Sequence, residues 1–185
     1  MTIHPDKPSN NSRNVAVSIF CIFIALTALS AFYPSQHPEG GTFDTGNIAF
    51  MLSASGLVLL MTPGLSFFYG GMVNSRSIIS TMLQSFVALG IVSLLWYVVG
   101  FSLAFGDDIG GVIGNPATFL FFDKVGLAAH DRMGPALPFV LFAAFQLKFA
   151  IITPALITGS FAERVRFWGY VIFVCLFSLL IYCPL

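Results

Sequence analysis

The feature that most constrains this chain is the length of its uncharged stretches. Thirty-one uncharged residues separate Asp44 from Arg76, and thirty more separate Arg76 from Asp107. Because a helix needs about 20 apolar residues to cross a bilayer, each stretch is long enough to cross it. Charged residues make up 9% of the chain, whereas soluble domains carry about 25%. The sequence therefore predicts an all-α polytopic membrane protein.

The order of polar and apolar segments predicts a tail, a first hydrophobic segment and four further spans. Residues 1–13 are polar and are expected to form a disordered tail. Residues 14–33 are apolar, and two interpretations stay open: a cleaved signal peptide or an additional transmembrane helix. The four further helices are expected at approximately 47–71, 79–105, 137–161 and 167–185.

The longest polar stretch lies between the second and third of these four helices. Residues 106–136 are rich in Gly, Pro and Asp and contain an apolar patch from Phe119 to Phe122. A connection of this length without a regular pattern is usually functional or disordered. It is interpreted as a linker, with a cover over a vestibule as the alternative.

Basic residues in the connections predict the orientation. Two basic residues, Lys124 and Arg132, fall on one side together with four aspartates. The other side carries Lys7, Arg13, Arg76, Arg164 and Arg166. Since Lys and Arg are enriched in cytoplasmic connections, this second side is expected to be cytoplasmic. We expect a multi-pass protein of the plasma or inner membrane.

One predicted span carries candidate functional side chains. Phe145 and Phe149 are four residues apart and therefore share a helix face, where they can form part of a cation site or pack in a core. Gln146 is an amide within the span and needs a partner. Lys148 lies near the middle of the span, where a charge costs roughly 2.5–3.5 kcal/mol. It is either functional, or it reaches an interface or a partner helix.

Several function classes are disfavoured. The net charge is zero and no basic patch exists, so nucleic acid is not expected as a partner. The three cysteines and three histidines match no metal motif, and no cofactor site is visible. Glu163 and Arg164 fit a solvated turn better than a gating ion pair. An enzyme is not expected.

Several segments, taken together, resemble the ammonium transporter (Amt/MEP/Rh) family. The run from Leu59 to Val73, LLMTPGLSFFYGGMV, resembles the first core helix of that family. Gln84-Ser85-Phe86 and Leu103-Ala104-Phe105-Gly106 resemble the start and end of the second helix. Phe145-Gln146, Phe149-Ala150, Ile152-Thr153, Gly159 and Phe161-Ala162-Glu163-Arg164 resemble the third helix and its cytoplasmic turn. The resemblance covers residues 44–185.

This resemblance implies a channel-like, trimeric transporter for nitrogen uptake that carries ammonium or ammonia through the lipid bilayer. Phe149 matches a ring of the family's pore gate, and Phe145 matches a neighbour that lines the outer vestibule. The family has about eleven helices in two inverted repeats. The match includes only the first four core helices, and the family's pore histidines are expected beyond Leu185.

Two functional hypotheses follow from this partial match. The first is a part of an ammonium transporter whose parent conducts the substrate. The second is a truncated subunit that is inactive by itself and acts as an interaction or regulatory partner of full-length transporters. The sequence favours the first hypothesis.

Overall fold

The computed structural model describes residues 10–32 and 40–184, which fall into two compact units. The first unit, Met1–Pro34, contains helix α1, Asn10–Phe32. The helix has 23 residues, and either interpretation of residues 14–33 fits a helix of this length. The tail expected at residues 1–13 lies largely outside the described residues.

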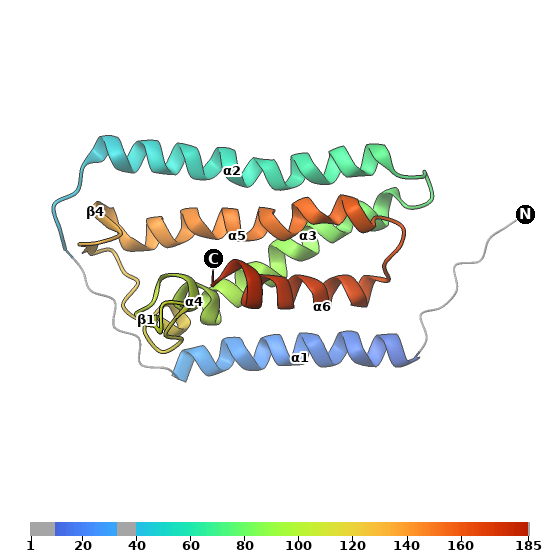
Figure 1. Ribbon diagram of the computed structural model, residues 1–185, viewed down its shortest axis with the longest axis horizontal. Coiled ribbons are helices and arrows are strands. Elements are labelled where there is room, and N and C mark those ends of the chain that lie inside the picture. The colour runs from blue at the N-terminus through green and yellow to red at the C-terminus, as the bar shows by residue number, and fades with distance from the viewer. Residues whose placement is uncertain (1–9, 33–39, 185) are drawn as a thin grey trace, which may run out of the picture. The chain divides into compact units, whose positions relative to one another are not determined.

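The second unit, Ser35–Leu185, is built on helices (Figure 1). Helix α2, Thr45–Met72, begins at Asp44, whose carboxylate accepts hydrogen bonds from the N–H groups of Gly46 and Asn47. Such a cap satisfies donors that the first turn leaves free. Helix α3, Ile78–Leu95, continues through a π-helical turn, Trp96–Gly100, into α4, Phe101–Phe105.

Two further helices complete the unit. Helix α5 is Phe139–Phe161, and α6 is Phe167–Phe177, which continues through a second π-helical turn, Ser178–Tyr182. The last helix thus extends to Tyr182, and Cys183 and Pro184 form a turn. Within the described residues, three helices are long and apolar enough to cross a membrane: Thr45–Met72, Ile78–Phe105 and Phe139–Phe161. Phe167–Tyr182 is a shorter apolar helix.

Helix α3 holds the unit together, because it packs against α2, α5 and α6, and α2 also packs against α5. Helices α2, α5 and α6 run nearly parallel to one axis, and α3 crosses them obliquely (Figure 1). The contact face of α2 is a stripe of small residues, Ser55, Thr62, Ser66 and Gly70. Ser66 Oγ donates to the carbonyl oxygen of Met82 on α3 at 3.0 Å. Small residues let membrane helices approach closely, so this stripe explains the α2–α3 contact.

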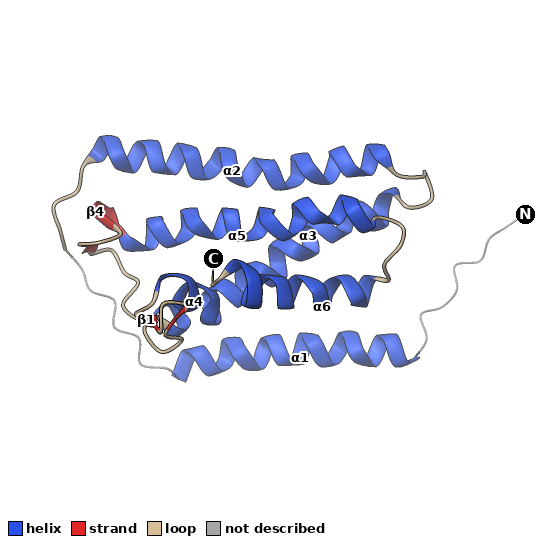
Figure 2. Ribbon diagram, in the orientation of Figure 1, coloured by secondary structure: helices blue, strands red, loops and turns tan. Residues whose placement is uncertain are grey.

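The long connection after α4 is folded (Figure 2). Strands β1, Asp108–Ile109, and β2, Ile113–Gly114, form one antiparallel pair. Strands β3, Ala129–His130, and β4, Gly134–Pro138, form another, and a 3-10 turn, Leu120–Phe122, lies between the pairs. The interpretation of this stretch as a plain linker is too simple, since it carries defined elements packed on the helix ends.

An aromatic cluster joins this connection to the helices, and Phe101, with 0% exposure, lies at its centre. The rings in contact with it are those of Trp96, Phe105, Phe119, Phe122 and Phe139. Ser102 adds polar links, because its Oγ donates to the carbonyl oxygen of Asn115 and accepts from the N–H of Phe119. The cluster occupies the end of the bundle that we call the loop end.

The opposite end of the bundle carries two short connections, residues 73–77 and 162–166, and we call it the arginine end. Asn74 N–H donates to Glu163 Oε1 at 2.9 Å, so the two connections lie side by side. No ion pair between Glu163 and Arg164 is present in the part of the chain that the structure describes. Glu163 lies in an exposed turn, as one sequence interpretation expected, and its carboxylate in addition links the two connections.

Candidate functional site

The candidate site is one face of helix α5 that the rest of the described chain leaves open. Phe149 is 37% exposed and Leu156 is 52% exposed, although both lie in a helix that packs against two others. Successive steps of four, four, three and four residues place side chains on one side of an α-helix. We define the open face of α5 by five residues: Phe145, Phe149, Thr153, Leu156 and Ser160.

The two phenylalanines predicted as a pair are brought together. The ring centroids of Phe145 and Phe149 lie 5.1 Å apart, and the ring planes make an angle of 72°. This edge-to-face geometry is a favoured arrangement of two aromatic rings. Because Phe149 remains partly exposed, the pair presents ring surface outward from the helix.

A proline interrupts the backbone hydrogen bonds of α5 shortly after Phe149. Pro154 lies inside α5 and has no N–H to donate to the carbonyl of Ala150. Thr153, directly before this proline, donates through its Oγ1 to the carbonyl oxygen of Phe149 at 2.7 Å. A hydroxyl bonded to the preceding turn often bends a helix, so the sequence after Phe149 is suited to a local change in direction.

Tyr69 of α2 reaches α5 beside the open face, towards the arginine end. Its hydroxyl donates to the carbonyl oxygen of Leu156 at 2.6 Å. The ring lies so close to Gly159 that a Cβ at this position would collide with it. Glycine is therefore required where the tyrosine crosses α5.

A cavity of about 390 Å³ begins beside this tyrosine. Its walls come from the ends of α2 and α5 and include Tyr69, Met72, Gly159, Ser160 and Glu163. Ser160 belongs to both the open face and the cavity wall. The open face thus runs from the phenylalanine pair to a cavity at the arginine end.

The two polar candidates, Gln146 and Lys148, lie on the same turn of α5 as the phenylalanines and are half-buried. Neither side chain forms a hydrogen bond or ion pair with any residue that the structure describes. Lys148 is the only charged residue in the helical segments from α2 onward. Their polar groups are thus available to partners outside the described chain, because no described residue forms a hydrogen bond or ion pair with them.

The sequence alone did not indicate Tyr69, Gly159 or Ser160 as site residues. Tyr69 and Leu156 are 87 positions apart, and no local pattern predicts that they meet. The ring of Tyr69 packs on Gly159 of α5, a contact between two separate helices. Among residues 10–32 and 40–184, no group of three or more His, Cys, Asp or Glu could hold a metal ion.

Helices of membrane-spanning length with a single charged residue, Lys148, among them, together with an aromatic pair and a cavity along one helix face, are features of a polytopic membrane protein of transporter type. The family model of the Ammonium Transporter Family matches residues 49–185. The chain belongs to the ammonium transporter family.

Individual relatives support this membership. An ammonium transporter of Mycobacterium tuberculosis (strain ATCC 25618 / H37Rv) is 43% identical over 162 residues, which cover 80% of this chain and 34% of the relative. One from Aquifex aeolicus is 45% identical over 157 residues, 84% of this chain and 36% of the relative. This chain therefore spans about a third of the length of these relatives.

Solved structures show the same fold. The crystal structure of Candida albicans Mep2 matches with a TM-score of 0.67 and 26% identity, over 77% of this chain and 31% of that protein. The crystal structure of Saccharomyces cerevisiae Mep2 matches with a TM-score of 0.62 and 30% identity, over the same shares of the two chains. The predicted fold class, the first core helices of the ammonium transporter fold, is confirmed.

Proposed function

We propose that this chain supplies the N-terminal part of a channel-like transporter that carries ammonium or ammonia, and that substrate passes along the open face of α5. The observation that carries the proposal is the partly exposed ring pair of Phe145 and Phe149. An aromatic ring attracts a cation through its electron-rich face, by about 0.5–2 kcal/mol. Such an attraction can hold an ammonium ion that has lost part of its water, without trapping it.

The remainder of the path follows the same face. In this proposal the substrate passes Thr153, Leu156 and Ser160 and reaches the cavity at the arginine end. Phe149 to Ser160 spans eleven residues, or about 16 Å along a helix, which is roughly half of a bilayer core. Gln146 and Lys148 flank the path, where further helices of a complete transporter can supply partners.

We further propose that the protein lies in the plasma or inner membrane with the arginine end in the cytoplasm, and that the complete protein is a homotrimer. Arg76, Arg164 and Arg166 support the orientation, because basic residues favour cytoplasmic connections. The homotrimer rests on the family resemblance. Labelling of a single cysteine at Ser75 from each side of the membrane tests the orientation.

Transport is tested with a chimera in which this chain replaces the matching third of the Mycobacterium tuberculosis relative. Uptake of labelled methylammonium into proteoliposomes is measured with and without Phe149→Ala. We expect the chimera to take up the label. Phe149→Ala should lower the uptake rate about tenfold, which corresponds to roughly 1.4 kcal/mol in the activation free energy. Leu57→Ala, which shortens a 68% exposed side chain on α2, is the matched control and should leave uptake unchanged.

A second candidate function, an interaction partner of full-length transporters, is favoured by the exposed surface of α2. Exposed apolar side chains on this helix include Phe50, Leu57, Leu60, Phe67 and Phe68. Such a surface is expected where lipid or another helix covers it. Co-reconstitution with a full-length relative discriminates between the candidates: a subunit of this kind forms mixed complexes and lowers uptake per full-length chain, whereas a transporter part does neither.

A further inference from the structure

The arginine end contains a backbone arrangement that side-chain-bearing residues rarely adopt. Glu163 has a φ of +67°, in the left-handed region. Its carboxylate accepts a hydrogen bond from the N–H of Asn74, which lies 89 positions away in the chain. The unusual conformation thus coincides with the contact that holds the connections 73–77 and 162–166 together.

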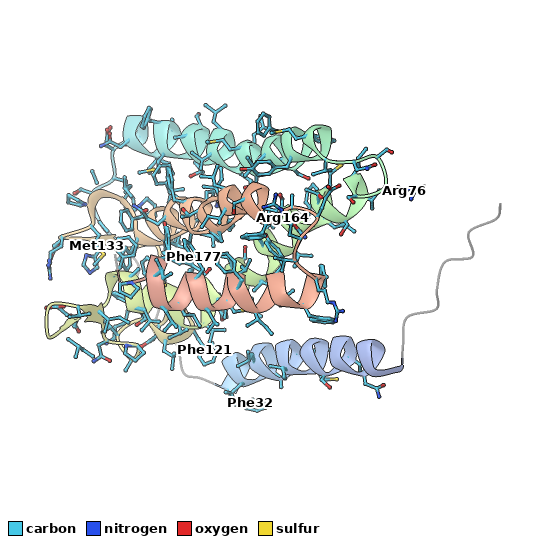
Figure 3. All side chains as sticks on the ribbon, turned by 45° about the vertical axis from the view of Figure 1, so that its right-hand side comes forward. Phe32, Arg76, Phe121, Met133, Arg164 and Phe177 are labelled. Carbon is cyan, nitrogen blue, oxygen red and sulfur yellow. The ribbon has the colours of Figure 1, made fainter. Side chains whose placement is uncertain are left out.

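This contact gathers positive charge at the arginine end. Arg76 is two residues from Asn74, and Arg164 and Arg166 are one and three residues after Glu163. All three arginines are exposed, and none of their guanidinium groups forms a hydrogen bond or ion pair with the residues that the structure describes. Figure 3 shows Arg76 and Arg164 in the two connections. Between residues 139 and 184 Glu163 is the only acid, and there is none between 45 and 106.

Exposed apolar side chains border these arginines on the helix side. Met72 at the end of α2 is 69% exposed, and Val165 and Phe167 are each 39% exposed. Trp168 follows Phe167 at the start of α6 and is half-buried. Arginine beside aromatic and apolar side chains at a helix end is typical of the boundary between hydrocarbon and head groups.

We propose that Arg76, Arg164 and Arg166 bind the phosphate-bearing head group of an anionic phospholipid, and that Glu163 positions them through its hydrogen bond to Asn74. Guanidinium groups bind phosphate oxygens through paired N–H donors, and three of them exceed the charge of the one neighbouring carboxylate. Met72, Val165 and Phe167 supply the apolar surface that the acyl chains of a lipid require. An acidic protein segment would gain nothing from that surface. Met72 and Glu163 also line the cavity at the arginine end, but binding of a lipid by the three arginines does not require that substrate passes through that cavity.

The two tryptophans of the chain make the proposal measurable. Trp168 lies two residues from Arg166, whereas Trp96 is 2% exposed and sheltered from lipid. Quenching of tryptophan emission by brominated phosphatidylglycerol, relative to brominated phosphatidylcholine, gives the ratio of their binding constants for the reconstituted chain. We expect phosphatidylglycerol to be preferred about tenfold at low salt, as charge attraction at a membrane surface permits.

The arginines and Glu163 are tested with matched variants. Replacing all three arginines with Gln should reduce the preference to about one, whereas Lys124→Gln with Arg132→Gln, which removes two charges at the loop end, should leave it unchanged. Glu163→Gln keeps an acceptor for Asn74 and should retain the preference or raise it. Glu163→Ala loses the acceptor and should lower the preference, although both changes remove the same negative charge.

Three results would overturn the proposal. One is a preference that survives removal of the three arginines. Another is an equal rise in preference in Glu163→Gln and Glu163→Ala, since it would show that Glu163 acts by charge and not by position. The third is loss of the preference in the presence of a competitor. Loss in millimolar phosphate at constant ionic strength would assign the site to free phosphate. Loss with a polyglutamate peptide would assign it to an acidic protein segment.

Discussion

Two groups of aromatic side chains in this chain differ in burial, and the difference separates folding from transport. The cluster around Phe101 is enclosed by rings from the π-helical turn Trp96–Gly100, from α4 and α5, and from the long connection. The rings of Phe145 and Phe149 contact each other, and Phe149 remains partly exposed on α5. The sequence alone does not distinguish the two groups, because both consist mainly of phenylalanines in apolar segments. Only the first group fills space that would otherwise be empty.

The largest effect is expected from Phe101→Ala in the enclosed cluster. Removing a fully buried ring leaves a cavity, and such changes cost about 3–5 kcal/mol of unfolding free energy. We expect a value near the lower end, since lipid also solvates the exposed ring in the unfolded state. Unfolding in a detergent titration followed by circular dichroism measures it. An unfolding free energy within error of the parent would show that the cluster does not stabilise the fold.

A smaller loss is expected from Gly159→Ala, which brings a methyl group against the ring of Tyr69. Overpacking of this kind typically costs 1–3 kcal/mol. The added change Tyr69→Ala removes the obstacle, so the double variant should be more stable than the sum of the single losses predicts. Strictly additive losses in the same detergent titration would contradict the contact.

Ser102→Ala is expected to cost about 1 kcal/mol, because it removes the hydroxyl that links Asn115 and Phe119 to α4. The loss should appear as faster amide hydrogen exchange in residues 115–119. Ser80→Ala changes an exposed serine at the start of α3 and serves as the control. Equal exchange in both variants would mean that Ser102 does not hold the connection.

The smallest effect on stability is expected from Phe149→Ala. The side chain is 37% exposed, so its truncation should cost less than about 1 kcal/mol. The same variant is expected to change transport strongly. A stability loss as large as that of Phe101→Ala would place Phe149 with the structural cluster and remove the distinction between the two groups.

The parts of this account that sequence predicts are those that depend on local pattern. The uncharged stretches beside Arg76 predict helices, because a bilayer admits few alternatives. The spacing of Phe145 and Phe149 predicts a shared face, and their rings do meet. Both features follow from helix periodicity and span length alone.

Other features depend on contacts between distant segments. The link between Asn74 and Glu163, and the crossing of Tyr69 over Gly159, join residues about 90 positions apart. The π-helical turns at Trp96–Gly100 and Ser178–Tyr182 occur where Trp96 and Tyr182 pack together, with ring centroids 6.2 Å apart. The fold of residues 106–138 depends on Phe119 and Phe122 reaching Phe101. No local pattern specifies these contacts.

The central claim is that Phe149 acts through its aromatic face on a permeating cation. Methylammonium uptake by the chimera carrying Phe149→Leu tests it most directly, because leucine keeps an apolar side chain but has no ring. The account predicts that Phe149→Leu is as impaired as Phe149→Ala, while Phe149→Tyr retains uptake. Normal uptake with leucine, from protein shown to be folded and inserted, would contradict it and leave Phe149 as an apolar packing residue.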